Sequence, residues 1–443
     1  MKTPRKFKLS TFQTIVIGFA LLILVGSLLL MLPVASRPDG STSFSDCLFT
    51  ATSAACVTGL VVRDTGTHWT LFGQAIILLL IQIGGMGVVT VGAVMAFISG
   101  RRIDLRERSV MQEAIAAPQV GGIVRLTRFF VAVALVIEAA GALLLMPAFI
   151  PAFGLGTGIF YSFFHSISAF CNAGFDLMGV QEPFSSLTGF SENILVNLVA
   201  ILLITIGGIG FLVWNDIKDH RFRVKQYRLQ SKIVLVTSAV LVLVPFLWFF
   251  FFEMQDLSAA GRILPSLFQS VTLRTAGFNT VDLNQMSGGG KGLMIFLMLT
   301  GGSPGSTAGG MKTTTIAVLF LTAVTVFRRK DDVGCFGRRI GEDTIRNAVA
   351  VVVMYAVLFF ISGIIISEIE DLPLLSCLFE TASAVGTVGL TLGITSSLGT
   401  VSRIVLIILM FLGRVGGLTL IYAAQSVRQS ARTMYPLEKV TVG

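Results

Sequence analysis

The sequence predicts an all-α membrane protein with eight transmembrane helices, arranged as four parallel repeats around one axis. Two observations predict the membrane class: 54% of the 443 residues are hydrophobic and only 13% are charged. Soluble domains average about a quarter charged residues. A third observation predicts the repeats, because four short apolar stretches that end in glycine recur along the chain.

Eight apolar runs are long enough to cross a hydrocarbon core about 30 Å thick. They lie at residues 12–34, 71–98, 129–150, 193–215, 233–252, 292–326, 347–367 and 403–424. The first run follows the basic segment 2–8, as the apolar region of a cleaved signal peptide does. Because this run is about twice as long as such a region, we expect a retained helix.

The cationic residues predict the orientation of the chain. Alternate connections hold 25 of the 33 Lys and Arg residues: four before the first span, six in each of 101–128, 218–232 and 328–346, and three after 425. The positive-inside rule places both termini and these three connections in the cytoplasm. The same rule explains the net charge of +9 as a topology signal. We therefore expect that the chain lies in a lipid bilayer and binds no nucleic acid.

A short apolar stretch lies on the external side between the two spans of each pair. The four stretches read FTATSAACVTGL (49–60), FHSISAFCNAGF (164–175), LFQSVTLRTAGF (267–278) and FETASAVGTVGL (379–390). In the first, second and fourth stretches the leading Phe lies ten residues before the glycine near the end of the stretch. In the third stretch it lies nine residues before that glycine. Each repeat is therefore a span, a short stretch and a second span, all in one orientation.

These repeats divide the chain into six parts. We expect a cytoplasmic N-terminus (1–11), repeat 1 (12–100), repeat 2 with a basic connection (101–218), repeat 3 (219–328), repeat 4 (329–424) and a cytoplasmic C-terminal tail (425–443).

The short stretches are too short to cross the membrane. About 11 helical residues reach about 16 Å, roughly half of the hydrocarbon core. Backbone that turns back at this depth must be buried in protein or line water. The C-terminal ends of four such helices would favour a cation on a common axis, and glycine allows the positive φ of the turn. The repeats therefore predict a central pore ringed by carbonyl groups, as in potassium channels; the alternative is four external loops with turn glycines.

Seven motifs, in order, give the chain a resemblance to a known family. They are VTGLVVRDTG (57–66), IQIGGMG (81–87), SAFCNAGF (168–175), RTAGFN (274–279), GGSPGSTAGGMKTTT (301–315), GTVGLTLG (386–393) and FLGRVGG (411–417). With them the chain resembles the ion-translocating membrane subunits, of the KtrB and KtrD type, of bacterial Ktr potassium uptake systems in the Trk/Ktr/HKT superfamily. The resemblance implies K+ uptake across the bacterial plasma membrane, often stimulated by Na+. It also implies a homodimer on a cytosolic, ATP- or ADP-binding regulatory ring of the KtrA or KtrC type.

The resemblance implies a selectivity filter of main-chain carbonyls. It carries the filter onto twelve residues of this chain: Val57, Thr58, Gly59, Asn172, Ala173, Gly174, Thr275, Ala276, Gly277, Thr387, Val388 and Gly389. None of the four segments keeps the Tyr-Gly that follows the glycine in channels, which favours weaker discrimination against Na+.

Two features predict a gate beneath this filter. Arg414 lies eleven residues after Arg403 in the last span, about 16 Å along a helix. A charge at this depth costs about 2.5–3.5 kcal/mol on insertion scales and is a functional hypothesis by default. We expect Arg414 in the permeation path; the alternative is a packing ion pair with a buried acid such as Glu138.

The second feature is a glycine-rich break in the run 292–326. Glycine and proline disfavour a helix interior, and irregular backbone at this depth must line a cavity. We therefore expect an intramembrane gating loop over 301–312. Alternatives are a kinked helix and a phosphate loop, although no lysine follows Gly310 directly and no strand precedes the loop. The expected gate residues are Gly301, Gly302, Gly305, Gly309, Gly310, Lys312 and Arg414.

These features favour a K+ translocating subunit over two other classes. A secondary transporter coupling Na+ or H+ to a solute would need intramembrane acids on several spans, but only Glu138 is clear. A membrane enzyme would need a nucleophile or metal cluster, and none is found; His165 and Glu380 occupy matching positions and are expected to orient the filter instead. No nucleotide motif is present, so we expect no cofactor on this chain, with K+ as the transported ion and Na+ as a candidate activator.

Overall fold

The computed structural model of the protein describes residues 10–37, 42–99, 103–115, 119, 121–424 and 438. The expected N-terminal segment 1–11 lies outside the described residues except at 10 and 11. The expected tail 425–443 lies outside them except at 438.

Four long helices start the four predicted repeats. They are α1 (Thr11–Leu30), α7 (Ile123–Phe153), α11 (Leu229–Trp248) with its π-helical continuation η4 (Phe249–Glu253), and α15 (Glu342–Glu370). Each is long and apolar enough to cross a membrane. The start of α1 is fixed by a capping box, in which Ser10 and Gln13 each bond the backbone N–H of the other.

A shorter helix follows each long one. These helices are α2 (Phe44–Ala55), α8 (Leu155–Phe170), α12 (Ala259–Thr272) and α16 (Leu374–Gly386). The phenylalanines near the start of the four glycine-ended stretches are all fully buried: Phe49, Phe164, Phe268 and Phe379. The one-residue slip in the third repeat therefore does not expose its aromatic ring.

The second apolar run of every repeat is broken. Helix α4 (Leu71–Met86) turns by 94° into α5 (Val88–Ile98), and α9 (Ile194–Gly208) turns by 92° into α10 (Phe211–His220). In repeat 3 the loop 300–312 separates α13 (Gly288–Leu299) from α14 (Thr313–Phe327). In repeat 4 a single glycine separates α17 (Thr400–Val415) from α18 (Gly417–Ala424).

The predicted spans over 71–98, 193–215 and 403–424 are therefore not single continuous helices. The chain turns at Gly87, Gly210 and Gly416, whose φ angles are +86°, +94° and +88°. Only glycine reaches such angles without steric cost, and a single glycine does not interrupt a hydropathy pattern. Among the described residues, four helices are long and apolar enough to span a membrane, or six if each of two bent pairs counts as one span.

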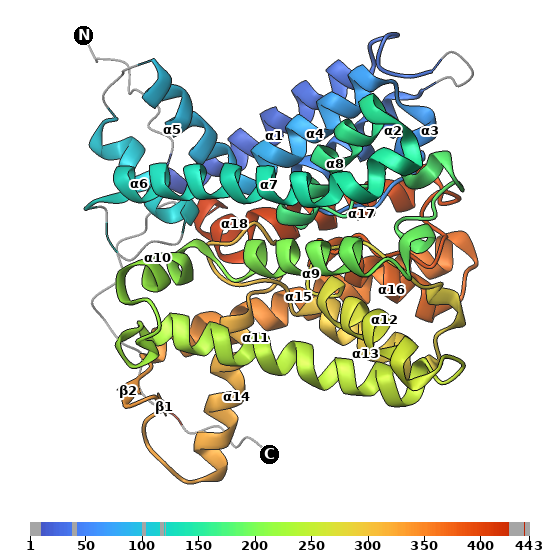
Figure 1. The fold of residues 1–443 in the computed structure, drawn as a ribbon. Coiled ribbons are helices and arrows are strands. Elements are labelled where there is room, and N and C mark those ends of the chain that lie inside the picture. The colour runs from blue at the N-terminus through green and yellow to red at the C-terminus, as the bar shows by residue number, and fades with distance from the viewer. Residues whose placement is uncertain are drawn as a thin grey trace.

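The remaining elements are short and lie at the two ends of the bundle. Figure 1 shows α6 (Leu105–Ile115), α5, α10 and the antiparallel hairpin β1 (Gly334–Cys335) and β2 (Arg338–Arg339) at one end, and α3 (Thr65–His68) at the other. Single 3-10 turns complete the chain: η1 (Met178–Val180), η2 (Thr188–Phe190), η3 (Val224–Gln226) and η5 (Leu283–Gln285). The connections rich in Lys and Arg therefore share the end that carries α6 and the hairpin.

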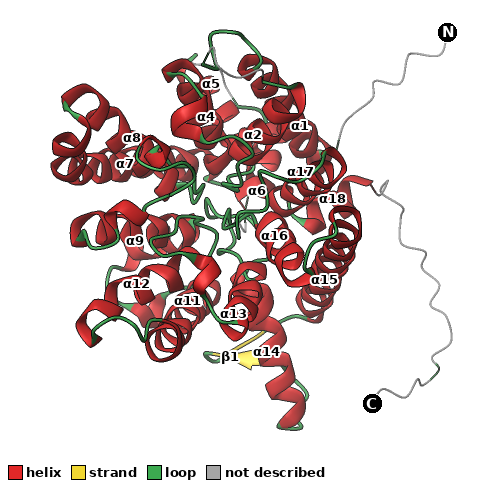
Figure 2. Ribbon diagram, turned by 90° about the vertical axis from the view of Figure 1, so that its right-hand side faces the viewer, coloured by secondary structure: helices red, strands yellow, loops and turns green. Residues whose placement is uncertain are grey.

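The helices form a ring around a centre that is filled by loops (Figure 2). Apolar side chains pack mainly in two clusters, one around α7, α8 and α9 and one around α13, α15, α16 and α17. All five cysteines are free, and four of them are buried within these clusters, as expected for a packing role.

Candidate functional site

The four glycine-ended segments adopt one backbone conformation. The glycine has a positive φ in each, from +69° at Gly174 to +93° at Gly59 and Gly389. The residue two positions earlier is also left-handed, with φ of +50° at Val57, +57° at Asn172, +72° at Thr275 and +51° at Thr387. Such an angle is a genuine outlier for the three β-branched residues, and strain of about 1–3 kcal/mol persists only where the surroundings impose it. The four segments thus have the same main-chain conformation, although their side chains differ.

The four segments contact one another in cyclic order. A Cβ atom on Gly59 would lie 2.5 Å from the carbonyl oxygen of Ala173, and one on Gly174 would lie 2.7 Å from that of Ala276. The same collision is closer still for Gly277 against Val388 and for Gly389 against Thr58. Only glycine fits at these four positions. Because the contacts run from repeat 1 to 2, 3, 4 and back to 1, the segments surround one axis, which Figure 2 views end on.

Hydroxyl groups near the end of each short helix hold the segment that follows. The Oγ atoms of Ser53 and Ser383 accept hydrogen bonds from the N–H groups of Gly59 (3.1 Å) and Gly389 (3.0 Å). Ser168 and Thr272 instead donate to the carbonyl oxygens of the residues after the glycine, Phe175 (2.7 Å) and Phe278 (2.6 Å). These four hydroxyls were not predicted from the sequence, although their recurrence five or six residues before each glycine is a detectable signal.

His165 and Glu380 support the outer part of two segments. His165 Nε2 accepts from the N–H of Leu177 (3.3 Å), and Glu380 accepts from the N–H of Leu392 (3.0 Å). Each of these N–H groups lies three residues after the segment glycine. Glu380 also accepts from the hydroxyls of Thr391 and Thr395, both at 2.6 Å. These bonds support the expectation that both side chains orient the segments.

Glycines of the second helices allow close contact with the short helices. A Cβ on Gly84, Gly207 or Gly413 would collide with a carbonyl oxygen at the end of α2, α8 or α16. In repeats 1 and 2 these glycines belong to the pairs at 84–85 and 207–208. In repeat 4 the contact is made three residues before the Gly416–Gly417 pair, because Gly416 turns the chain instead.

The loop 300–312 crosses the deep end of the segments and contains no helical residue, which excludes the kinked-helix alternative. Its backbone N–H groups bond to helix-terminal carbonyls: Ser303 to Gly208 (3.1 Å), Thr307 to Gly207 (3.3 Å) and Gly310 to Gly413 (3.1 Å). The C-terminal carbonyls of α9 and α17, which have no intrahelical partner, thereby bind the loop.

The five expected gate glycines lie at close contacts within this loop or around it. A Cβ on Gly301 or Gly302 would meet Gly309 or Ala308 of the loop itself. One on Gly305, where φ is +64°, would lie 2.5 Å from the Ile115 carbonyl oxygen of α6. Cβ atoms on Gly309 and Gly310 would meet Thr387 and Gly386, at the start of the fourth segment.

Arg414 joins this loop to the end of α4. Its guanidinium donates to the carbonyl oxygens of Thr307 and Gly84, and to that of Gly85 at 3.0 Å. Among the described residues Arg414 forms no ion pair with Glu138, whose carboxylate accepts two hydrogen bonds, of 3.0 and 3.1 Å, from the Gln82 amide. The charge of Arg414 is therefore balanced by main-chain dipoles at a helix C-terminus.

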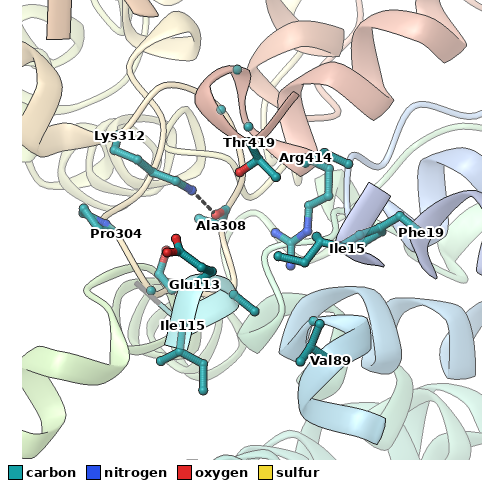
Figure 3. A pocket seen from close by; sticks show the side chains of 18 of the residues that line it. Ile15, Phe19, Val89, Glu113, Ile115, Pro304, Ala308, Lys312, Arg414 and Thr419 are labelled. Carbon is teal, nitrogen blue, oxygen red and sulfur yellow. Dashed lines mark hydrogen bonds between the residues drawn. The ribbon is translucent and has the colours of Figure 1, made fainter. Parts of the chain in front are cut away.

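A cavity of about 330 Å³ lies on the other side of the loop. Figure 3 shows Lys312, Glu113 and Arg414 around Ala308 of the loop, with Ile15 and Phe19 of α1 on the apolar side. Lys312 Nζ donates to the carbonyl oxygens of Ala308 (2.8 Å) and Gly309 (3.4 Å). The two expected gate cations therefore both bind main-chain oxygens of the loop and face this cavity.

Three acids follow the segment glycines on the outer side. Asp64 accepts from the N–H groups of Thr67 (2.8 Å) and Phe184 (2.9 Å), so it ties the outer loop of repeat 1 to that of repeat 2. Asp282 accepts from Asn284 N–H (2.9 Å) within its own turn. Asp176 accepts from Met178 N–H (2.9 Å). Burial, with the nearby Asp64 adding to it, raises the pKa of Asp176 to about 7, and the Met178 bond opposes this rise.

The chain belongs to the TrkH family, whose sequence profile, described as "Cation transport protein", matches residues 2–434. It is therefore a polytopic membrane protein that transports cations, and its class is that of a transporter rather than an enzyme. The solved structure titled "Crystal Structure of the Potassium Transporter TrkH from Vibrio parahaemolyticus" has the same fold, with a TM-score of 0.76 and 20% identity over 96% of this chain and 87% of that one.

Two curated relatives confirm the resemblance to the membrane subunits of Ktr systems. The "Ktr system potassium uptake protein B" of Bacillus subtilis is 38% identical over 97% of this chain and 96% of that protein. The "Potassium/sodium uptake protein NtpJ" of Enterococcus hirae is 39% identical over 100% of this chain and 99% of that protein.

Proposed function

We propose that this protein carries K+ into the cell through a selectivity filter made of main-chain carbonyls. The cyclic contacts of the four segments are the observation that carries this proposal, since they bring the four glycine-ended segments together around one axis. The short helices end at these segments, so the negative ends of their dipoles favour a cation there. Rings of carbonyls can replace the hydration shell of the ion. The filter consists of residues 57–59, 172–174, 275–277 and 387–389.

The gate of this pathway is the loop 301–312 together with Arg414. The loop is bound to helix ends by three backbone hydrogen bonds and by the guanidinium, which supports its role in closing the deep end of the filter. The cationic charges of Arg414 and Lys312 oppose K+ beside this loop. Conduction then requires that the loop moves aside, which breaks its hydrogen bonds to the carbonyl oxygens of Gly207, Gly208 and Gly413.

The surroundings of the pore follow from the relatives and from the charge pattern. The word "system" in the names of the Ktr relatives supports a multicomponent assembly, in which a homodimer sits on a nucleotide-binding ring of the KtrA or KtrC type. The name of the Enterococcus protein includes sodium, which supports a role for Na+ as transported ion or activator. We place the protein in the plasma membrane with eight crossings and cytoplasmic termini, on the positive-inside rule.

Expression in bacteria that lack their own K+ uptake systems tests the function. Cells that express this chain, together with its regulatory subunit, should grow at low K+ and take up Rb+, faster with Na+ than without. Vector-only cells provide the background. Growth and Rb+ uptake that stay at the vector level, in cells whose membranes contain the folded protein, would contradict the proposal. Uptake of an organic solute in fixed ratio with Na+ would favour a secondary transporter.

We expect uptake to depend on external pH through Asp176, two residues after Gly174. With a pKa of about 7, this carboxyl is neutral in mild acid and becomes an anion that attracts cations as the pH rises. Rb+ uptake at constant membrane potential should rise between about pH 6 and about pH 8. The Asp176→Asn variant should lose this rise, whereas Asp282→Asn, which removes an acid from a separate turn, should keep it. The same rise in both variants and the wild type would rule out Asp176.

The folding stability should change with pH in the direction opposite to uptake, so it should fall as the pH rises. Because the pKa of Asp176 is higher in the folded protein than the ordinary value of 3.8, the folded state prefers the neutral carboxyl. Its contribution to stability is therefore present in acid and is lost as the pH rises from about 4 to about 7.

A further inference from the structure

We propose that Asn172 and Thr307 form a latch by which the gating loop sets the ion selectivity of the filter. This inference rests on the proposed function, since it assigns a specific role to side chains of the proposed filter and gate. In it, Asn172 is a positioning residue whose side chain connects repeat 2 of the filter to the loop of repeat 3.

The latch is a closed set of short contacts. Asn172 Nδ2 donates to Thr307 Oγ1 at 3.0 Å, and that hydroxyl donates in turn to the carbonyl oxygen of Phe170 at 2.9 Å. Both Asn172 and Thr307 are fully buried. Phe170 is the last residue of α8, so the loop hydroxyl caps the very helix that leads into the filter. The Asn172 amide also donates to the carbonyl oxygens of Phe170 and Ile204, both at 3.4 Å. The Thr307 hydroxyl is therefore the nearest of its three acceptors.

The contact is unique to the second segment among the described residues. The matching positions in the other segments are Val57, Thr275 and Thr387. Valine has no polar side-chain atom, and the hydroxyls of Thr275 and Thr387 have no hydrogen-bond partner. Three segments therefore hold their left-handed residue without a side-chain hydrogen bond to the loop, while the second holds Asn172 at φ +57° with such a bond.

The other side of Thr307 is attached to the gate. Its carbonyl oxygen accepts from the guanidinium of Arg414, and its N–H donates to Gly207. One loop residue thus bonds the gate arginine through its main chain and the filter through its side chain. The conformation of residue 172, and with it the size of one quarter of the carbonyl ring, therefore depends on the same loop residue that the gate arginine binds.

Selectivity rather than rate is the measurement that tests this latch. Purified protein in planar bilayers or liposomes gives the Na+ to K+ permeability ratio from reversal potentials. Thr307→Val keeps the shape of the side chain but removes the hydroxyl, and it should raise this ratio about fivefold, the effect of losing one ordinary hydrogen bond. Thr307→Ser keeps the hydroxyl and should restore the wild-type ratio. Thr307→Ala repeats the test if valine disturbs folding.

Ser306→Ala provides the matched control. Ser306 precedes Thr307 in the loop, and its hydroxyl bonds to the Ser303 carbonyl oxygen (2.7 Å) rather than to the filter. This variant should keep the wild-type permeability ratio. Asn172→Ala should raise the ratio, and the double variant with Thr307→Val should raise it no further than the larger single effect, because both remove the same bond.

Two results would overturn the latch. A Thr307→Val variant that changes all cation fluxes by the same factor, with an unaltered ratio, would leave the loop as a gate without influence on the filter. Effects of Asn172→Ala and Thr307→Val that simply add would show independent roles. Absence of K+ flux in the wild-type protein would overturn the proposed function, and is distinguishable from both because no ratio could then be measured.

Discussion

Gly389→Ala is expected to reduce Rb+ uptake at least about a hundredfold while the protein still inserts and folds. An added Cβ would collide with the carbonyl oxygen of Thr58 and come within 2.9 Å of the Cα of Gly59. The left-handed φ of +93° adds strain of about 1–3 kcal/mol for a residue with a side chain. The fourth segment must therefore shift away from the first, and the ring of carbonyls opens at that point. A shift of this kind removes ligands that an ion needs in place of water.

Gly393→Ala separates the steric effect from the strain. Gly393 lies four residues later with a nearly identical φ of +91°, but no atom lies within 4 Å of its added Cβ. The two substitutions thus impose similar backbone strain, and only the first disturbs the neighbouring segment. We expect uptake by Gly393→Ala within about threefold of the wild type, given a strain term of this size. Equal losses in the two variants would mean that strain alone, and not closure of the ring, limits transport.

Arg414→Gln is expected to raise Rb+ flux about tenfold in liposomes without a regulatory subunit. Hydrogen bonds from a charged donor contribute about 1.5–3 kcal/mol each, and this guanidinium makes three of them, between the loop and the end of α4. The shorter, neutral glutamine cannot bridge the same carbonyls. The loop is then held less firmly, and a positive charge beside the path is lost, so both effects favour conduction.

Arg346→Gln is the control for this second substitution. Arg346 lies on α15 and pairs with the exposed Glu342, at 3.5 Å, so its replacement removes the same charge and, among the described residues, breaks no bond to the loop. Flux in this variant should match the wild type. A flux in Arg414→Gln that equals or falls below the wild-type value would contradict the role of Arg414 in holding the gate shut.

Local sequence patterns predicted much of the fold and the equivalence of the four segments of the proposed filter. Three of the glycine-ended stretches have the same spacing from their phenylalanine and the stretch of repeat 3 differs by one residue, so their structural equivalence was visible, and the structure brings all four together. The breaks at Gly87, Gly210 and Gly416 were not predictable in this way, because hydropathy averages over a turn made by one small residue. The glycine-rich stretch of repeat 3 was predictable only because several glycines and Pro304 occur together.

The contacts between the loop and the filter were beyond sequence reasoning. Asn172 and Thr307 are 135 residues apart, and neither lies in a pattern that names the other as its partner. Arg414 was recognised from its depth in an apolar run, but its partners are main-chain carbonyls at positions 84, 85 and 307. Main-chain acceptors have no residue-type signature, so only the folded structure identifies them.

The position of the permeant ion tests the central claim most directly. A crystal structure of the protein grown in Rb+ would locate this K+ analogue by its anomalous scattering. We predict a peak on the common axis, ringed by the carbonyl oxygens of the segments that end at Gly59, Gly174, Gly277 and Gly389. An axis without any peak, in crystals where Rb+ is bound elsewhere on the protein, would contradict the account.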